Sequence, residues 1–136
     1  MLDKKIKDIY HIDDSFSIDN EKYNKRLKLL LNKTRGEITE NDVYTMLLQQ
    51  ELEDLAIEKA IEFIKINPLA GEMWDGQFLE QLAGISADKL VAYKEDLQKL
   101  IPYMDNQINE ILWDFETEKE EFLFRYAKFK DKVANL

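Results

Sequence analysis

The chain has 136 residues, of which 45% are hydrophobic, and this size and composition are typical of one globular domain. It contains no cysteine, so disulfides, thiolate metal sites and thiol catalysis are excluded. Its first residues are charged, and no run reaches the roughly 18 apolar residues of a membrane-spanning helix. We therefore expect no signal peptide, no membrane association and a cytoplasmic location.

Acidic residues are concentrated in the middle of the chain, although the net charge of the whole is only −9. Residues 37–121 hold 21 acidic and six basic side chains, a balance of −15, whereas 1–36 and 122–136 carry +3 each. A field of that sign attracts basic partners and repels nucleic acid and anionic membranes. We therefore expect a basic protein as the partner and no binding of nucleic acid.

Few residues in this chain interrupt helical structure. It has four Gly and two Pro, and Leu, Lys, Glu and Ile are abundant, which predicts an all-α fold. Residues 1–18 are weakly patterned and predict at most a short helix. Apolar residues at three- and four-residue steps predict a first clear helix over about 19–34, with Gly36 as its stop.

A long helical stretch is predicted over 40–66. It follows Thr39, which has an acidic residue three positions later and so resembles a capping box. Asn67-Pro68 is expected to end it, because a residue before proline avoids helical geometry. The apolar stripe changes phase at 49–53, which leaves two alternatives open, one bent helix or two helices with a tight joint between them.

The second half of the chain predicts three further helices. Asp75 is expected to cap a short helix over 76–83, and a serine cap begins another over 86–100. Pro102 then suits the first turn of a long final helix over 103–133. A helix of about 30 residues would span about 45 Å.

Together these stretches predict one domain over residues 1–136, an irregular bundle of about five or six helices with a long C-terminal helix. A solenoid of HEAT-like helix pairs is the alternative fold. It would require about three repeats with a common motif, and the predicted helices share none.

The residues needed for most catalytic sites are missing. His11 is the only histidine, which rules out the usual di-iron pattern of a helical bundle, and no glycine-rich phosphate loop is present. Glu110, Asp114 and Glu118 could share a helix face as metal ligands, but nothing pairs them with a second ligand type, and we interpret them as a solvated acidic face. We therefore expect no enzyme activity, no metal and no cofactor.

Clusters of acids beside tryptophans are the candidate partner-binding surface. Those at 54, 58 and 62 step by four and share one face opposite the apolar stripe, and Trp74 lies in an acidic loop bounded by glycines. Trp113 and Phe124 are predicted to project from one side of the final helix, unless that helix is buried on two sides. The candidate residues are Glu51, Asp54, Glu58, Glu62, Glu72, Trp74, Asp75, Trp113 and Asp114.

In size, acidity, helical build and lack of cysteine, the whole chain resembles the small acidic α-helical immunity proteins of bacterial polymorphic toxin systems, including contact-dependent growth inhibition. The resemblance implies a non-catalytic protein that neutralises a cognate basic toxin through its acidic surface, as a monomer or weak dimer when free. It favours a nuclease as the toxin, since nucleases are basic to bind a polyanion. The paired tyrosines before proline of colicin-type immunity proteins are replaced by Ile101-Pro102-Tyr103, so no residue role is carried over.

Two other classes of function fit the sequence. One is a structural or scaffold module, homodimeric through the C-terminal helix. The other is an enzyme that uses carboxylates and a divalent ion.

Overall fold

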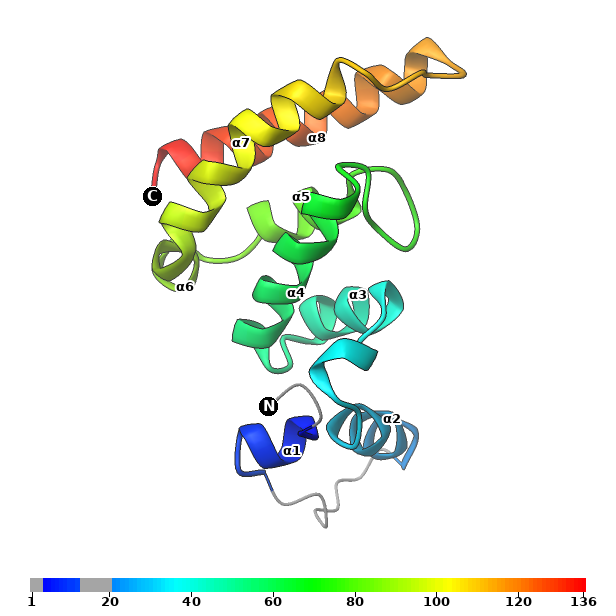
Figure 1. The fold of residues 1–136 in the computed structure, drawn as a ribbon, viewed down its shortest axis with the longest axis vertical. Helices are drawn as coiled ribbons and strands as arrows, with labels where there is room; N and C mark the ends of the chain where they lie inside the picture. Colours follow the sequence, from blue (N-terminus) through cyan, green and yellow to red (C-terminus); the bar gives the residue numbers. More distant parts are fainter. Residues whose placement is uncertain (1–3, 13–20) are drawn as a thin grey trace.

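The computed structural model describes residues 4–12 and 21–136, and every named secondary-structure element in that part of the chain is a helix (Figure 1). This confirms the predicted all-α fold. Two short 3₁₀ turns, η1 and η2, interrupt the succession of α-helices. In chain order the elements are α1 (Ile6–Ile9), α2 (Glu21–Leu31), η1 (Arg35–Glu37), α3 (Glu40–Gln49), α4 (Glu53–Ile66), α5 (Gln77–Ala83), α6 (Ala87–Leu90), η2 (Val91–Tyr93), α7 (Lys94–Ile108) and α8 (Glu116–Ala134).

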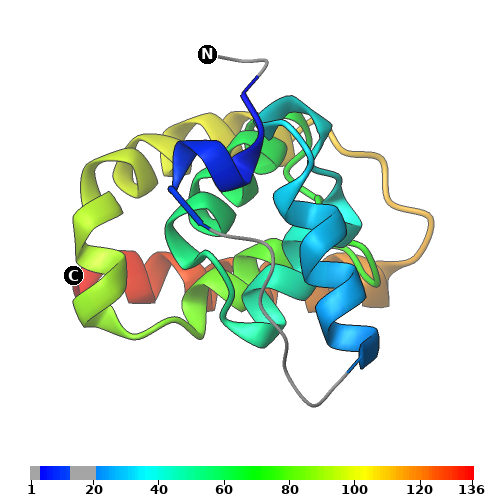
Figure 2. The same cartoon turned by 90° about the horizontal axis from the view of Figure 1, so that it is seen from below.

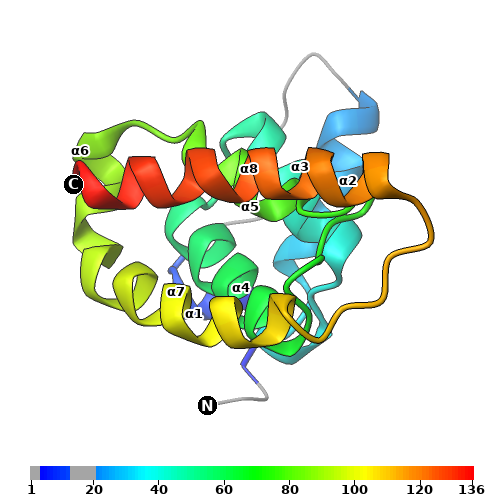
Figure 3. The same ribbon diagram turned by 90° about the horizontal axis from the view of Figure 1, so that it is seen from above.

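The helices are stacked along one long axis, with α1 and α2 at one end and the α7–α8 pair at the other (Figure 1). Seen from the α1 end, the short α1 and the longer α2 cover one end of the stack (Figure 2). At the opposite end, α7 and α8 run side by side in opposite directions, and the loop before α5 lies at the same end as their connection (Figure 3). This arrangement brings the acidic loop at 71–76 next to the start of α8.

The α4 helix supplies a large part of the core. Its side chains are buried on three of its sides, against α3, α5 and α7, which is why the stretch is so rich in Ile and Ala. The C-terminal α8 contributes a narrower stripe at steps of three and four residues, which packs mainly on α5 and α7. That stripe consists of Phe122, Tyr126, Phe129 and Val133.

The stretch at 40–66 forms two helices, the second of the two alternatives. Thr39 caps α3, with its hydroxyl oxygen accepting from the Asp42 N–H at 3.1 Å, and the capping box is complete. Gln50 and Leu52 both have left-handed backbone geometry, with φ of 56° and 45°, and this double reversal makes the joint between α3 and α4. The phase change of the apolar stripe at 49–53 therefore corresponds to this joint.

The predicted helix over 19–34 differs from the structure at its C-terminal end. Residues 13–20 lie outside the described part, and α2 ends at Leu31 rather than 34. The Lys33 carbonyl accepts a hydrogen bond from the Ile6 N–H at 2.8 Å, so the backbone pairs with the N-terminal segment instead of continuing the helix. Gly36 therefore lies inside η1 and does not stop α2.

The predicted caps of the middle helices also need correction. Gly76, not Asp75, occupies the N-cap position of α5, with φ of 78°, and it provides no side-chain cap. Ser86 does precede a helix, but its hydroxyl makes no cap bond, and the helix α6 is short. The turn η2 then separates α6 from α7, so the predicted helix over 86–100 is interrupted.

The predicted helix over 103–133 is wrong. Pro102 lies inside α7, where it removes the donor for the Gln98 carbonyl, but Gln98 is exposed and water can replace that hydrogen bond. The chain then turns through 109–115 before α8 begins. A continuous helix would carry the α8 aromatic stripe away from the core, whereas the turn brings Phe122 back onto it, fully buried. The C-terminal helix is therefore 19 residues long.

None of the helices in the described residues has both the length and the apolar character needed to cross a membrane.

Candidate functional site

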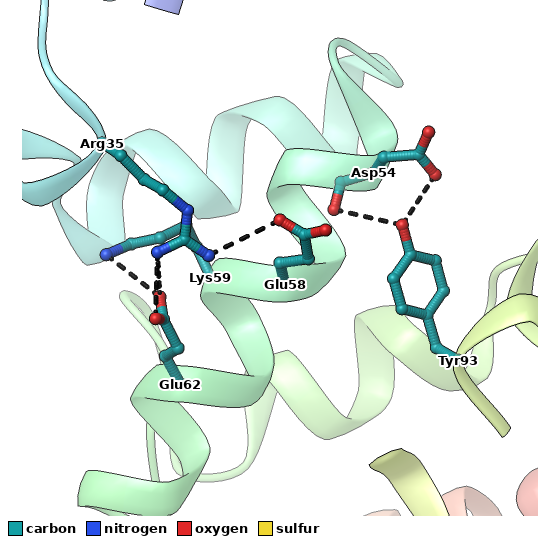
Figure 4. Close-up of polar contacts among 6 residues, drawn as sticks. All are labelled: Arg35, Asp54, Glu58, Lys59, Glu62 and Tyr93. Atoms are coloured by element: carbon teal, nitrogen blue, oxygen red, sulfur yellow. Dashed lines mark hydrogen bonds and ion pairs between the residues drawn. The ribbon is translucent and has the colours of Figure 1, made fainter. Parts of the chain in front are cut away.

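The acidic face of α4 is largely paired within the protein. Glu58 and Glu62 lie on one side of the helix, as their spacing predicts, and Arg35 reaches both, with nitrogen–oxygen distances of 3.5 and 2.9 Å (Figure 4). Lys59 adds a third contact, 3.2 Å from Glu62. Partial burial raises the pKa of the Glu62 carboxyl, but the hydrogen bonds and charges of Arg35 and Lys59 outweigh it, and the net shift is downward. This cluster therefore fastens η1 to α4.

The first turn of α4 is paired as well. Asp54 accepts a hydrogen bond from the Tyr93 hydroxyl at 2.8 Å, and Glu53 forms an ion pair with Lys89 (Figure 4 shows the Tyr93 contact). Burial, followed by the hydrogen bond to Asp54, raises the pKa of the Tyr93 phenol. These contacts connect the α6–η2 segment to α4, so the acids in this part of the face also stabilise the packing of neighbouring helices.

Glu51 is placed where a partner would reach it least easily. It lies in the α3–α4 joint with its side chain 6% exposed, and it forms an ion pair with Arg26 of α2. Its second carboxylate oxygen is buried and has no hydrogen-bond partner in the described part of the chain. Glu51 thus holds α2 against the joint, a contact between distant segments that the sequence pattern does not reveal.

Trp74 is held in a fixed position at the surface. Its side chain is 43% exposed, and its indole N–H donates to Glu80 on α5 at 3.0 Å. The guanidinium of Arg125, from α8, lies 5.8 Å from the centre of the indole ring. A large aromatic side chain is therefore presented to solvent while two neighbours restrain its orientation.

Arg125 links α8 to the Trp74 loop. Its Nε donates to the same Glu80 oxygen at 3.1 Å, and its Nη1 donates to the backbone carbonyl of Asp75 at 3.0 Å. A weaker contact joins it to Glu121, one turn earlier on α8, at 4.0 Å. Arg125 was not among the predicted site residues. Its spacing of four from Glu121 could have signalled that contact, but not the contacts with Glu80 and Asp75.

Side chains from the loop and α8 enclose a surface hollow of about 240 Å³, which we call the Trp74 hollow. A second hollow of about 200 Å³ adjoins it, since both include Glu121 and Arg125, and Phe124 lines this second one. The Trp74 hollow is lined by Trp74, Asp75, Glu118, Glu121 and Arg125. It brings together two predicted site residues, Trp74 and Asp75, with two acids of α8 that are more than 40 positions away in the sequence.

Trp113 and Phe124 do not share one side of a helix, which corrects the sequence prediction. Trp113 lies in the 109–115 turn, partly buried, with its ring centre 5.5 Å from that of Phe122. Phe124 is on α8, 62% exposed, with the Lys128 ammonium 4.5 Å from its ring centre. Their sequence separation predicted a common side only on the assumption of an unbroken helix.

Most acids around the turn and the start of α8 are exposed and form no ion pair within the part of the chain that the structure describes. Asp114, next to Trp113, forms no ion pair within the described residues, and neither does Glu72 in the Trp74 loop. The same holds for the other acids of this segment apart from Glu121, namely Glu110, Glu116, Glu118 and Glu120. Exposed apolar side chains lie among them, with Leu112 97% and Phe115 64% exposed.

The described residues include no group of three or more His, Cys, Asp or Glu side chains placed to hold a metal ion. The surface at the Trp74 end presents a partly exposed indole, exposed aliphatic and aromatic groups, and carboxylates that form no ion pair among the described side chains.

Comparison with known proteins identifies the family. A family model described as CDI immunity proteins, the proteins of contact-dependent growth inhibition, matches residues 8–100, more than half of the chain. The matched residues include the Trp74 loop and end within α7. Neither the curated proteins nor the solved structures contain a match. The chain therefore belongs to the CDI immunity proteins, and membership implies that it neutralises a cognate toxin, which confirms the resemblance found in the sequence.

Proposed function

We propose that this immunity protein neutralises a basic toxin, a nuclease, by binding it through an acidic surface. The observation that carries the proposal is the balance of −15 over residues 37–121, part of which is displayed as exposed carboxylates without ion pairs in the described structure. Nucleases need a basic surface to bind a polyanionic substrate. An acidic protein can occupy that same surface.

Speed of association is the property that such a charge distribution improves most. Complementary charges steer two proteins together and raise the association rate constant far above that of neutral partners. A cell exposed to an incoming nuclease benefits from rapid capture, because each free toxin molecule turns over many substrates. We place this encounter in the cytoplasm, where the nucleic acid is.

Inhibition by binding alone is the simplest mechanism for a protein with such an acidic surface. CDI immunity proteins are generally non-catalytic inhibitors. We therefore propose that the chain blocks the toxin without modifying it, and that one immunity protein inactivates one toxin molecule.

The test uses the toxin domain encoded beside this chain. Stopped-flow association should slow at least tenfold between about 50 and 500 mM NaCl, while the dissociation rate changes much less, because salt screens the long-range attraction. Nuclease activity should disappear at a ratio of one to one. Failure to form a complex at the lower salt concentration, or an association rate independent of salt, would contradict the proposal.

A homodimeric scaffold remains the second candidate, favoured by the exposure of Phe124 and Leu123 on α8. Pairing two copies through this helix would also bring two sets of unpaired carboxylates together, which opposes association at low salt. Sedimentation velocity separates the cases. A monomer at all concentrations up to about 100 μM would end the scaffold proposal, since a stable dimer would form well below that concentration.

A further inference from the structure

Two acidic surfaces are candidates for the toxin contact, and they differ in how many of their carboxylates form ion pairs within the protein. On the α4 face, the carboxylates of Glu58 and Glu62 are occupied by Arg35 and Lys59 (Figure 4). At the end of the molecule formed by the Trp74 loop and the first half of α8, most of the carboxylates have no ion pair in the described part of the chain. A partner cation would have to displace an existing cation on the α4 face, whereas at the Trp74 end it would add a new pair.

The charges around the Trp74 hollow leave it negative. Three carboxylates, Asp75, Glu118 and Glu121, line it together with a single cation, Arg125. That cation is already engaged by Glu80, which does not line the hollow, at 3.1 Å. The Arg125 charge is thus compensated mainly from outside. Asp75 and Glu118 have no ion pair in the described residues, and Glu121 has only the 4.0 Å contact with Arg125, so these carboxylates can accept an incoming cation.

The indole ring adds a second kind of recognition. A guanidinium group stacks on the face of an indole and donates to carboxylates in a planar fork, so it uses both features of this site together. A lysine ammonium lacks the planar fork, and an uncharged aromatic group leaves the carboxylates without a partner. A hollow of about 240 Å³ is large enough for the end of one such side chain.

The Trp74 loop is held in place before any partner arrives. Trp74 is restrained by Glu80 and Arg125, and the loop backbone lies directly on α8, since a Cβ added at Gly76 would lie 2.8 Å from the Phe122 ring. Side chains that are already fixed lose little conformational entropy on binding. Such immobilised, exposed tryptophans are frequent energetic centres of protein interfaces.

We propose that the toxin docks on the Trp74 end of the molecule and inserts an arginine side chain into the Trp74 hollow, between the indole and the carboxylates of Asp75, Glu118 and Glu121. This inference rests on the proposed function, because it assigns the surface and the partner group for that same neutralisation. Phe124, in the adjoining hollow, supplies apolar contact area beside the arginine.

The experiment compares two charge-matched double variants for affinity to the neighbouring toxin domain. Glu118→Gln/Glu121→Gln removes two charges at the hollow, and Asp54→Asn/Glu58→Gln removes two charges on the α4 face. We expect the first to weaken binding at least about tenfold and the second less than about threefold. Thermal unfolding of each free variant checks that its fold is retained.

A second measurement tests whether the Trp74 indole lies in the interface with the toxin. The chain has two tryptophans, so incorporation of 5-fluorotryptophan gives two ¹⁹F resonances, which a Trp113→Phe variant assigns. Addition of unlabelled toxin should shift the Trp74 resonance more than the Trp113 resonance. Trp74→Phe, which keeps a ring, should bind more weakly than wild type and more tightly than Trp74→Ala.

The arginine is identified by pairing Trp74→Ala with single Arg→Ala changes in the toxin. For one arginine, the loss in the double variant should be at least fivefold smaller than the product of the two single losses. The proposal is overturned if the hollow variants bind like wild type, or if no toxin arginine couples to Trp74. If the wild-type protein still neutralises the toxin in these assays, the proposed function holds even though the docking proposal is wrong. If the wild-type protein does not bind the toxin at all, both the proposed function and the docking proposal are wrong.

Discussion

Replacing Gly76 with alanine should destabilise the fold, because this glycine lies where the Trp74 loop meets α8. Its φ of 78° is in the left-handed region, and an added Cβ would lie 2.8 and 3.0 Å from two carbon atoms of the Phe122 ring. That ring is fully buried, with Trp113 at 5.5 Å and Tyr126 at 6.3 Å between ring centres. The ring therefore has little room to move away from the methyl group.

The expected loss follows from three effects. Left-handed geometry costs about 1–2 kcal/mol for a residue with a Cβ. Overpacking against a rigid core adds about 1–3 kcal/mol. Reduced freedom of the unfolded chain returns about 0.4–1 kcal/mol. The free energy of unfolding of Gly76→Ala should therefore be about 1–5 kcal/mol below that of wild type.

Urea denaturation provides the assay, and Gly36→Ala provides the matched control. Gly36 has no heavy atom within 4 Å of an added Cβ, and its φ is not positive. We expect that substitution to leave stability unchanged or to raise it by up to about 1 kcal/mol. Both variants should keep the m-value, so the midpoint reports stability. Equal midpoints for the two variants would show that the loop is not seated on α8 as described.

Three further substitutions test local features of the structure. Thr39→Ala should lower the free energy of unfolding by about 1 kcal/mol, measured in urea, because it removes the side-chain cap of α3. Tyr126→Phe should reduce the loss of stability at alkaline pH: burial and the hydrogen bond to Asp105 raise the Tyr126 pKa above 10.0, so its contribution is present below pH 10 and lost as pH rises further. Glu62→Gln should flatten the acid limb of stability below pH 4.5, since the Glu62 pKa is lowered from 4.5 in the folded state and its contribution is lost as pH falls through that lowered value. Thermal unfolding at a series of pH values measures both, and limbs as steep as in wild type would contradict these assignments.

Features set by neighbouring residues were predictable from the sequence. The capping box at Thr39 and the end of α4 before Pro68 depend on a few consecutive side chains, and both predictions are confirmed. The two left-handed residues in the α3–α4 joint had no such signal. Leucine rarely adopts this geometry, so nothing in the local sequence predicted it at Leu52.

The wrong prediction of a helix starting at Pro102 arose because packing outweighed a local preference. Pro102 was expected to begin a helix, yet burial of Leu97, Leu100 and Met104 stabilises α7 on both sides of it. Burying apolar side chains of this size contributes about 1.5–3 kcal/mol each, against about 3 kcal/mol for an internal proline. Leu112 lies within the predicted helix over 103–133, yet in the structure it is almost wholly exposed in the turn, so an apolar residue at this position gave no sign of the break.

The candidate site shows the same division between local and long-range information. The common face of Asp54, Glu58 and Glu62 follows from a spacing of four, which is a helical property. The neutralisation of that face by Arg35 depends on a contact across 27 positions in the sequence, and the contact of Arg125 with Glu80 spans 45. Sequence patterns therefore located the acids on a common helix face, but they could not predict which of these acids form ion pairs within the protein.

The free protein retains uncompensated negative charge at the Trp74 end, and this has an energetic consequence for binding. Mutual repulsion among carboxylates on the first half of α8 disfavours the folded free protein, although acids in its first turn are favoured by the helix dipole. Glu118 gains from that dipole, whereas Glu121 lies beyond the first turn and gains little. A toxin cation in the Trp74 hollow would relieve the repulsion in addition to forming new contacts. The α4 face offers no such relief, because Arg35 and Lys59 already provide it, and this difference is the physical reason to assign the partner to the Trp74 end.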